Sequence, residues 1–185
     1  MKTRFVDDEI SYDGAQLRAH WILRSFGLVG DALVAFVGPC SVRLDEMADL
    51  EDFSGPGIAG DRMLHFLWER FDEASLEAGV VRQRLFACIA AEALASRGVV
   101  VTRSGDDLYV DERKLSISIA TRSSVSSLLH FAMNVSTEGT PVPTSGLDEL
   151  GIGAADLAQD ILVRIAAEET SIQDARVKVR AKGEA

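Results

Sequence analysis

Polar side chains alternate with apolar ones along residues 114–120 and again along residues 128–135. Alternation of this kind is typical of a β-strand with one face against a core. If the two strands pair antiparallel, their polar face collects five side chains: Lys114, Ser116, Ser118, His130 and Asn134. These groups suit a ligand with a carbonyl or a negative charge, because a cation and hydrogen-bond donors stabilise both. The alternative is a sheet face that meets only water.

An acidic segment, residues 45–52, is a second candidate for chemistry. Magnesium binds one or two carboxylates together with phosphate oxygens, so Asp45, Asp49 and Asp52 are candidate Mg²⁺ ligands. The alternative is a solvated acidic turn, since charge runs commonly face water. Neither the cysteines, Cys40 and Cys88, nor the histidines have the close spacing of a zinc site.

The elements that must position these residues are a mixture of helices and strands. Apolar residues at helical spacing predict helices over 14–26, 81–97 and 154–170. Short apolar or alternating runs predict strands over 32–37, 63–71, 99–102, 108–110, 114–120 and 128–135. This order predicts an α+β fold, a mostly antiparallel sheet flanked by helices. The length of 185 residues suits one domain, residues 1–185, with a basic tail from about residue 174.

Composition limits the partners. The chain carries a formal net charge of −10, which argues against a nucleic-acid binder, because such proteins need a basic surface to neutralise phosphates. No apolar run approaches the roughly 20 residues needed to cross a bilayer, so no membrane partner is expected. The first residues lack the apolar stretch of a secretory signal, so we expect a cytoplasmic protein. The polar strand face makes a small molecule the expected partner. Composition does not distinguish a monomer from a homodimer.

Several segments resemble known families. The run Asp-Asp-Leu-Tyr-Val-Asp-Glu-Arg-Lys-Leu-Ser at 106–116 resembles the signature of biotin and lipoate protein ligases. The run His-Phe-Ala-Met-Asn-Val at 130–135 is similar to a strand of the lipoyl/octanoyl transferases. The segments LVAFVGPC at 33–40 and DLED at 49–52 resemble an uncharacterised family, domain of unknown function 366.

The ligase resemblance implies a class II synthetase-like fold and a ligation or acyl-transfer site. Lys114 matches the catalytic lysine that contacts the acyl group, Asp107 matches the acid of the preceding strand, and ATP with Mg²⁺ are the implied cofactors. Glu112 stands where that signature has a turn glycine. The glycine- and arginine-rich adenylate loops are missing, and Glu149-Leu150-Gly151-Ile152 replaces the Pro-Cys-Gly-Ile of the transferases. Standard lipoylation is therefore not expected, and a non-catalytic ligand-binding or oligomeric member of the fold is the alternative.

Overall fold

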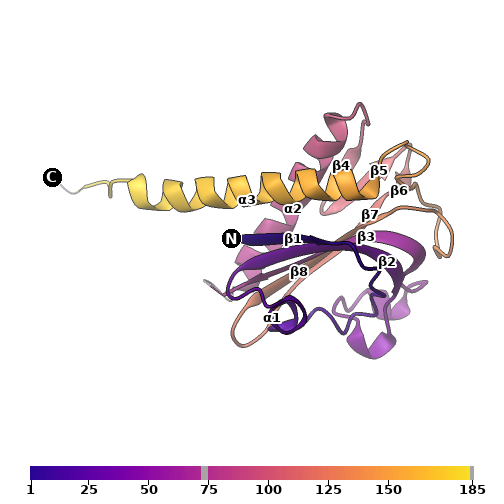
Figure 1. Cartoon of the computed structure of the whole chain (residues 1–185), viewed down its shortest axis with the longest axis horizontal. Helices are drawn as coiled ribbons and strands as arrows, with labels where there is room; N and C mark the ends of the chain where they lie inside the picture. Colours follow the sequence, from indigo (N-terminus) through magenta and orange to yellow (C-terminus); the bar gives the residue numbers. More distant parts are fainter. Residues whose placement is uncertain (72–74, 184–185) are drawn as a thin grey trace.

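A five-stranded sheet forms the centre of the computed structural model, which describes residues 1–71 and 75–183 (Figure 1). Its strand order is β1-β2-β3-β8-β7. The strands are β1 (Lys2–Val6), β2 (Ala32–Ser41), β3 (Ala59–Arg70), β7 (Ser116–Arg122) and β8 (Ser127–Asn134). Only the β1–β2 pair of this sheet is parallel, so the predicted mostly antiparallel α+β fold is confirmed. Residues 72–74 and 184–185 of the predicted domain lie outside the described residues.

Two long helices cover one face of this sheet (Figure 1). Helix α2 (Leu76–Ala95) packs on β7 and β8, and α3 (Ala154–Lys178) packs on β1 and β2. The short helix α1 (Trp21–Phe26) joins the apolar cluster on the opposite face. Among residues 1–71 and 75–183, no helix combines the length and hydropathy needed to cross a membrane.

The central strands are buried on both faces, which explains their nearly continuous apolar sequence. In β2, Leu33 and Ala35 belong to the core beneath α2 and α3, whereas Val34 and Phe36 belong to the cluster on the opposite face. Strand β3 follows the same rule, with Phe66 on the helix side.

A small second sheet contains most of the segment that resembles the ligase signature, residues 106–116. It consists of β4 (Thr102–Ser104), β5 (Asp107–Val110) and β6 (Arg113–Lys114), all antiparallel. The β5–β6 turn has Asp111 at φ 47° and Glu112 at φ 67°. Two successive positive φ values are the mark of a type I′ hairpin turn, whose twist matches the flanking strands. Short 3₁₀ turns at Leu44–Glu46 and Asp52–Ser54 lie at the two ends of the acidic segment.

Four element predictions need correction. The strand expected at 114–120 is divided, because Lys114 belongs to β6 of the small sheet and β7 of the large sheet begins at Ser116. The predicted helix over 14–26 is helical only from Trp21, because residue 20 takes a left-handed conformation and donates its backbone N–H to the Glu69 carboxylate. The strand expected at 99–102 begins only at Thr102, because the Val99 N–H still bonds to a carbonyl at the end of α2. The predicted basic tail is partly helical, since α3 continues to Lys178.

Candidate functional site

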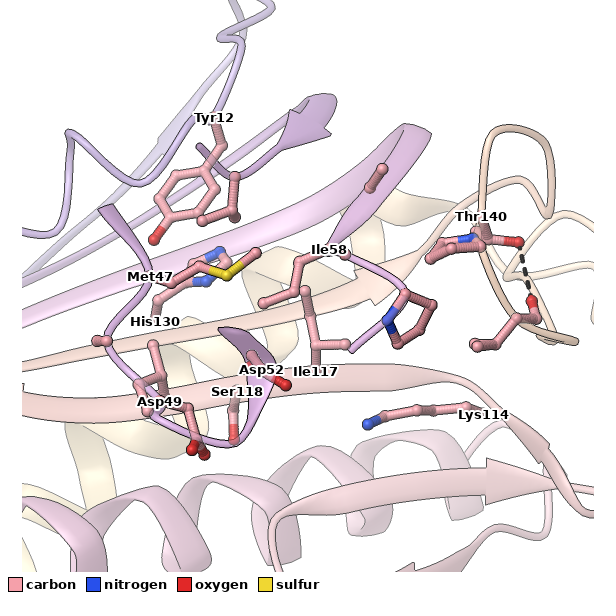
Figure 2. Close-up of a pocket in the computed structure, with 18 of the residues that line it drawn as sticks. Tyr12, Met47, Asp49, Asp52, Ile58, Lys114, Ile117, Ser118, His130 and Thr140 are labelled. Carbon is pink, nitrogen blue, oxygen red and sulfur yellow. Dashed lines mark hydrogen bonds between the residues drawn. The ribbon is translucent and has the colours of Figure 1, made fainter. Parts of the chain in front are cut away.

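A cavity of about 400 Å³ lies on the sheet face opposite α2 and α3 (Figure 2). Strands β7 and β8 supply its floor, and the segment between β2 and β3 covers it. Residues 140–144 and the start of β5 close one end, where Lys114 lies. Figure 2 places Tyr12 and His130 at the other end.

The register between β7 and β8 places different side chains on the cavity face from those that the sequence predicts. Strands β7 and β8 do pair antiparallel, but Ile117 lies opposite Ala132 and Ile119 opposite His130. The isoleucines therefore share the cavity face with His130, whereas Ser116 lies opposite Met133 on the helix side. The pairing is offset by one residue from the expected one, and such an offset exchanges the two faces of a strand.

Lys114 lies at the edge of the cavity, and Figure 2 shows its ammonium group pointing inward. Its Nζ is 2.8 Å from Oδ2 of Asp107, and both side chains are partly exposed. The Lys114 carbonyl accepts hydrogen bonds from the Ser145 N–H and from Nδ2 of Asn134. The backbone around the lysine is thereby fixed while the ammonium group stays accessible.

Other predicted ligand-binding residues are held by neighbours. Asn134 lines the cavity, but its amide bonds the carbonyls of Lys114 and Ser145, so it positions the lysine. Ser118 also lines the cavity and donates to Oδ2 of Asp106 at 2.6 Å. Ser116 is fully buried, does not line the cavity, and accepts the Leu108 N–H.

The acidic segment contributes two of its three predicted metal ligands to the cavity. Asp49 and Asp52 line the wall, whereas Asp45 is exposed and pairs with Arg43. Burial raises the pKa of Asp52, and the nearby Asp49 carboxylate raises it further. In the described part of the chain, no group of three histidine, cysteine or acidic residues is arranged to hold a metal ion. The structure therefore does not bring the three aspartates together.

The far end of the cavity contains the predicted residue His130 together with two residues that the sequence did not indicate, Tyr12 and His65. His130 is buried there, stacked on Tyr12 with ring centroids 3.9 Å apart. Behind it, Nδ1 of His65 lies 3.1 Å from Nε2 of His130. Tyr12 reaches this place through a bridge to Cys40, a contact between distant segments that no local pattern reveals.

Apolar side chains line the cavity between its two ends. Figure 2 shows Met47, Ile58 and Ile117 between Tyr12 and Lys114. A ligand that spans the cavity would therefore bury an apolar middle section. Cys40 supplies no nucleophile, because burial raises the pKa of its thiol to about 12 and keeps it protonated.

Residues 1–180 match the family described as domain of unknown function DUF366. The chain belongs to this family. An uncharacterized protein of Methanocaldococcus jannaschii is 33% identical over 180 residues, which cover 94% of this chain and 81% of that protein. A protein of unknown function from Pyrococcus horikoshi is 38% identical with a TM-score of 0.93, covering 97% of this chain and 99% of that one.

Structures of two ligases show the same fold at low identity. A biotin protein ligase from Aquifex aeolicus in complex with biotin and ATP is 16% identical with a TM-score of 0.60, covering 90% of this chain and 69% of that one. A proposed lipoate protein ligase from T. acidophilum with bound lipoic acid is 16% identical with a TM-score of 0.56. That match covers 89% of this chain and 84% of the other. The DUF366 chain therefore has a biotin/lipoate protein ligase-like fold.

Proposed function

We propose that this DUF366 protein binds a small molecule with an apolar chain and a carbonyl or carboxyl group. The observation that carries this proposal is the position of Lys114 at one end of a cavity whose middle is apolar. The chain of the ligand would lie against Met47, Ile58 and Ile117, and its carbonyl oxygen would accept a hydrogen bond from the lysine. The ligase structures that share the fold hold biotin or lipoic acid, which are molecules of this class.

Acyl transfer is the reaction that this arrangement supports best. A lysine beside a carbonyl stabilises the negative charge that develops on the oxygen when the carbonyl carbon is attacked. Asp107 holds the ammonium group at 2.8 Å and thereby fixes its direction. The acyl group must enter attached to a leaving group, as in an acyl phosphate, and the bond to that group breaks as the bond to the acceptor forms. The attacking group must come from a second substrate, because the buried Cys40 thiol stays protonated.

ATP fits the lining poorly. Among the described residues that line the cavity, Lys114 is the single positive charge, and the lining also includes the carboxylates of Glu46, Asp49, Asp52, Asp106 and Asp107. A triphosphate would bring further negative charge against these groups. We therefore derive no step through ATP or Mg²⁺.

A non-catalytic ligand-binding protein is the second candidate. It is favoured by the ion pair between Lys114 and Asp107, which already satisfies part of the lysine's charge, and by the protonated Cys40 thiol. Release of AMP from octanoyl adenylate in the presence of an amine acceptor separates the two. Acyl transfer requires release faster than in buffer and a loss of that acceleration in Lys114→Ala. A binding protein gives only the buffer rate.

Binding itself is tested by thermal unfolding and calorimetry with octanoate, lipoate and biotin. A ligand at about 100 times its Kd should stabilise the fold by about 2.7 kcal/mol, a rise in Tm of about 5–10 °C. Lys114→Ala should weaken binding by about 10- to 100-fold, because a hydrogen bond to a charged group is lost. Lys178→Ala, at the exposed end of α3, is the matched control and should bind like the wild type. Unchanged binding in Lys114→Ala, or no binding of any of the three acids, would overturn the proposal.

A further inference from the structure

Two histidines of neighbouring strands meet beneath the end of the cavity that is remote from Lys114. Nδ1 of His65 lies 3.1 Å from Nε2 of His130, and Nε2 of His65 lies 3.2 Å from the Gly38 carbonyl oxygen. Their exposed fractions are 0% and 3%. The acyl-binding proposal gives this pair no role.

The Gly38 carbonyl determines which nitrogens carry hydrogens. A carbonyl oxygen only accepts, so Nε2 of His65 must be the donor and its Nδ1 an acceptor. Nε2 of His130 must then donate to that Nδ1. In a neutral imidazole one nitrogen donates and the other accepts, so Nδ1 of His130 is a hydrogen-bond acceptor.

This acceptor opens into the cavity. Within residues 1–71 and 75–183, Nδ1 of His130 has no hydrogen-bond partner, and the atom is not fully buried. The small exposed part of the ring therefore includes Nδ1, and the residue lines the cavity. The hydroxyl of Tyr12 is likewise not a fully buried atom without a partner. Tyr12 as a residue is 2% exposed, and its ring stacks on that of His130.

Both imidazoles are neutral near pH 7. Burial lowers the pKa of His65 to about 4 and lowers the pKa of His130 well below its usual range. This end of the cavity consequently offers no positive charge to a carboxylate. The carboxyl or carbonyl end of a ligand belongs at Lys114, and a different group belongs here.

We propose that His130 selects ligands that carry a neutral O–H or N–H donor at the end of the chain remote from the carboxyl group, with Tyr12 beside it. The proposal rests on the proposed function, which places the carboxyl end at Lys114. It narrows the ligand class from plain acyl chains to acyl chains with a polar donor at the far end. A plain alkyl end would leave Nδ1 of His130 buried without a partner, which is unfavourable.

Three eight-carbon acids test the inference: octanoate, 8-hydroxyoctanoate and 8-methoxyoctanoate. The hydroxyl donates and the methoxy oxygen only accepts. We expect 8-hydroxyoctanoate to bind about five- to tenfold more tightly than 8-methoxyoctanoate, the value of one buried hydrogen bond. Equal affinities would overturn this inference and leave the acyl-binding proposal standing. Failure of all three to bind would overturn this inference, and the lipoate and biotin titrations would then decide the acyl-binding proposal separately.

His130→Phe should remove the preference for the hydroxyl while retaining octanoate binding. His20→Asn, at a histidine outside the cavity lining, is the control and should keep the preference. A preference that persists in His130→Phe would contradict the role of His130.

If His130→Phe does not fold, the wild-type protein still provides a decisive measurement. Long-range ¹⁵N–¹H correlation spectra at pH 7 should show both buried histidines with the proton on Nε2. A His130 proton on Nδ1 would overturn the inference, because that nitrogen could not then accept from a ligand.

Discussion

The two buried histidines make the stability of the fold depend on pH. His65 has an ordinary pKa of 6.5 when unfolded, and burial lowers it to about 4 in the folded protein. Between these values the unfolded chain binds more protons, so stability is complete above pH 6.5 and falls as the pH drops towards 4. The nearby Tyr12 and Cys40 stay protonated throughout, because burial raises both of their pKa values.

We therefore expect urea unfolding to show a loss on the order of 3 kcal/mol between pH 7 and pH 4, from His65 alone. His65→Leu should be less stable at pH 7 but should show a flatter pH profile, while His20→Asn should keep the wild-type slope. An unchanged slope in His65→Leu would show that other groups carry the pH dependence.

The sequence predicts which individual residues lie at the cavity better than it predicts how they are grouped there. Lys114 and Asp107 are found because a contiguous signature contains both, and the alternation in β8 correctly places His130 and Asn134 on one face. Ser116 is misplaced because nothing in the sequence specifies the register between β7 and β8 to within one residue. Tyr12 is missed because its position depends on a bridge between segments far apart in the chain.

At the scale of elements, the sequence predicts long periodic segments well, but it predicts short edge strands and the ends of helices poorly. Helices α2 and α3 and strands β2 and β8 follow clear apolar patterns, since each buries a broad apolar surface. Strand β1 is missed because it is a short edge strand with charged and exposed residues. Helix α1 is overestimated because residue 20 is held in a left-handed conformation by the Glu69 carboxylate, a contact made only in the folded protein.

The β5–β6 turn provides a test at this scale, because it delivers Lys114 to the cavity. Glu112 has a φ of 67°, a conformation that costs a residue with a Cβ about 1 kcal/mol and costs glycine little. Glu112→Gly should therefore raise the free energy of unfolding by about 0.5–1 kcal/mol, measured by urea titration. Glu112→Ala loses the same charge but keeps the Cβ, so it should not show this gain. Equal effects of the two substitutions would assign the change to the side chain instead of the backbone.

For the whole molecule, charge opposes the ligand that the cavity is proposed to bind. The chain carries a formal net charge of −10, and the cavity wall includes Glu46, Asp49 and Asp52. A carboxylate ligand must approach against this field before it meets the short-range attraction of Lys114. Salt screens the distant charges most, because the Debye length falls from about 30 Å at 0.01 M to about 8 Å at 0.15 M.

Octanoate should consequently bind about fivefold more tightly at 0.15 M than at 0.01 M NaCl, the reverse of the trend for a site dominated by its lysine. Calorimetric titrations at the two salt concentrations measure this, and neutral octanamide is the control because it should respond weakly. Lys114→Ala should retain the increase with salt, because the repulsion arises from the rest of the molecule. Weaker octanoate binding at higher salt would mean that the local field of the lysine outweighs the acidic surface, and the ligand would then be steered by attraction.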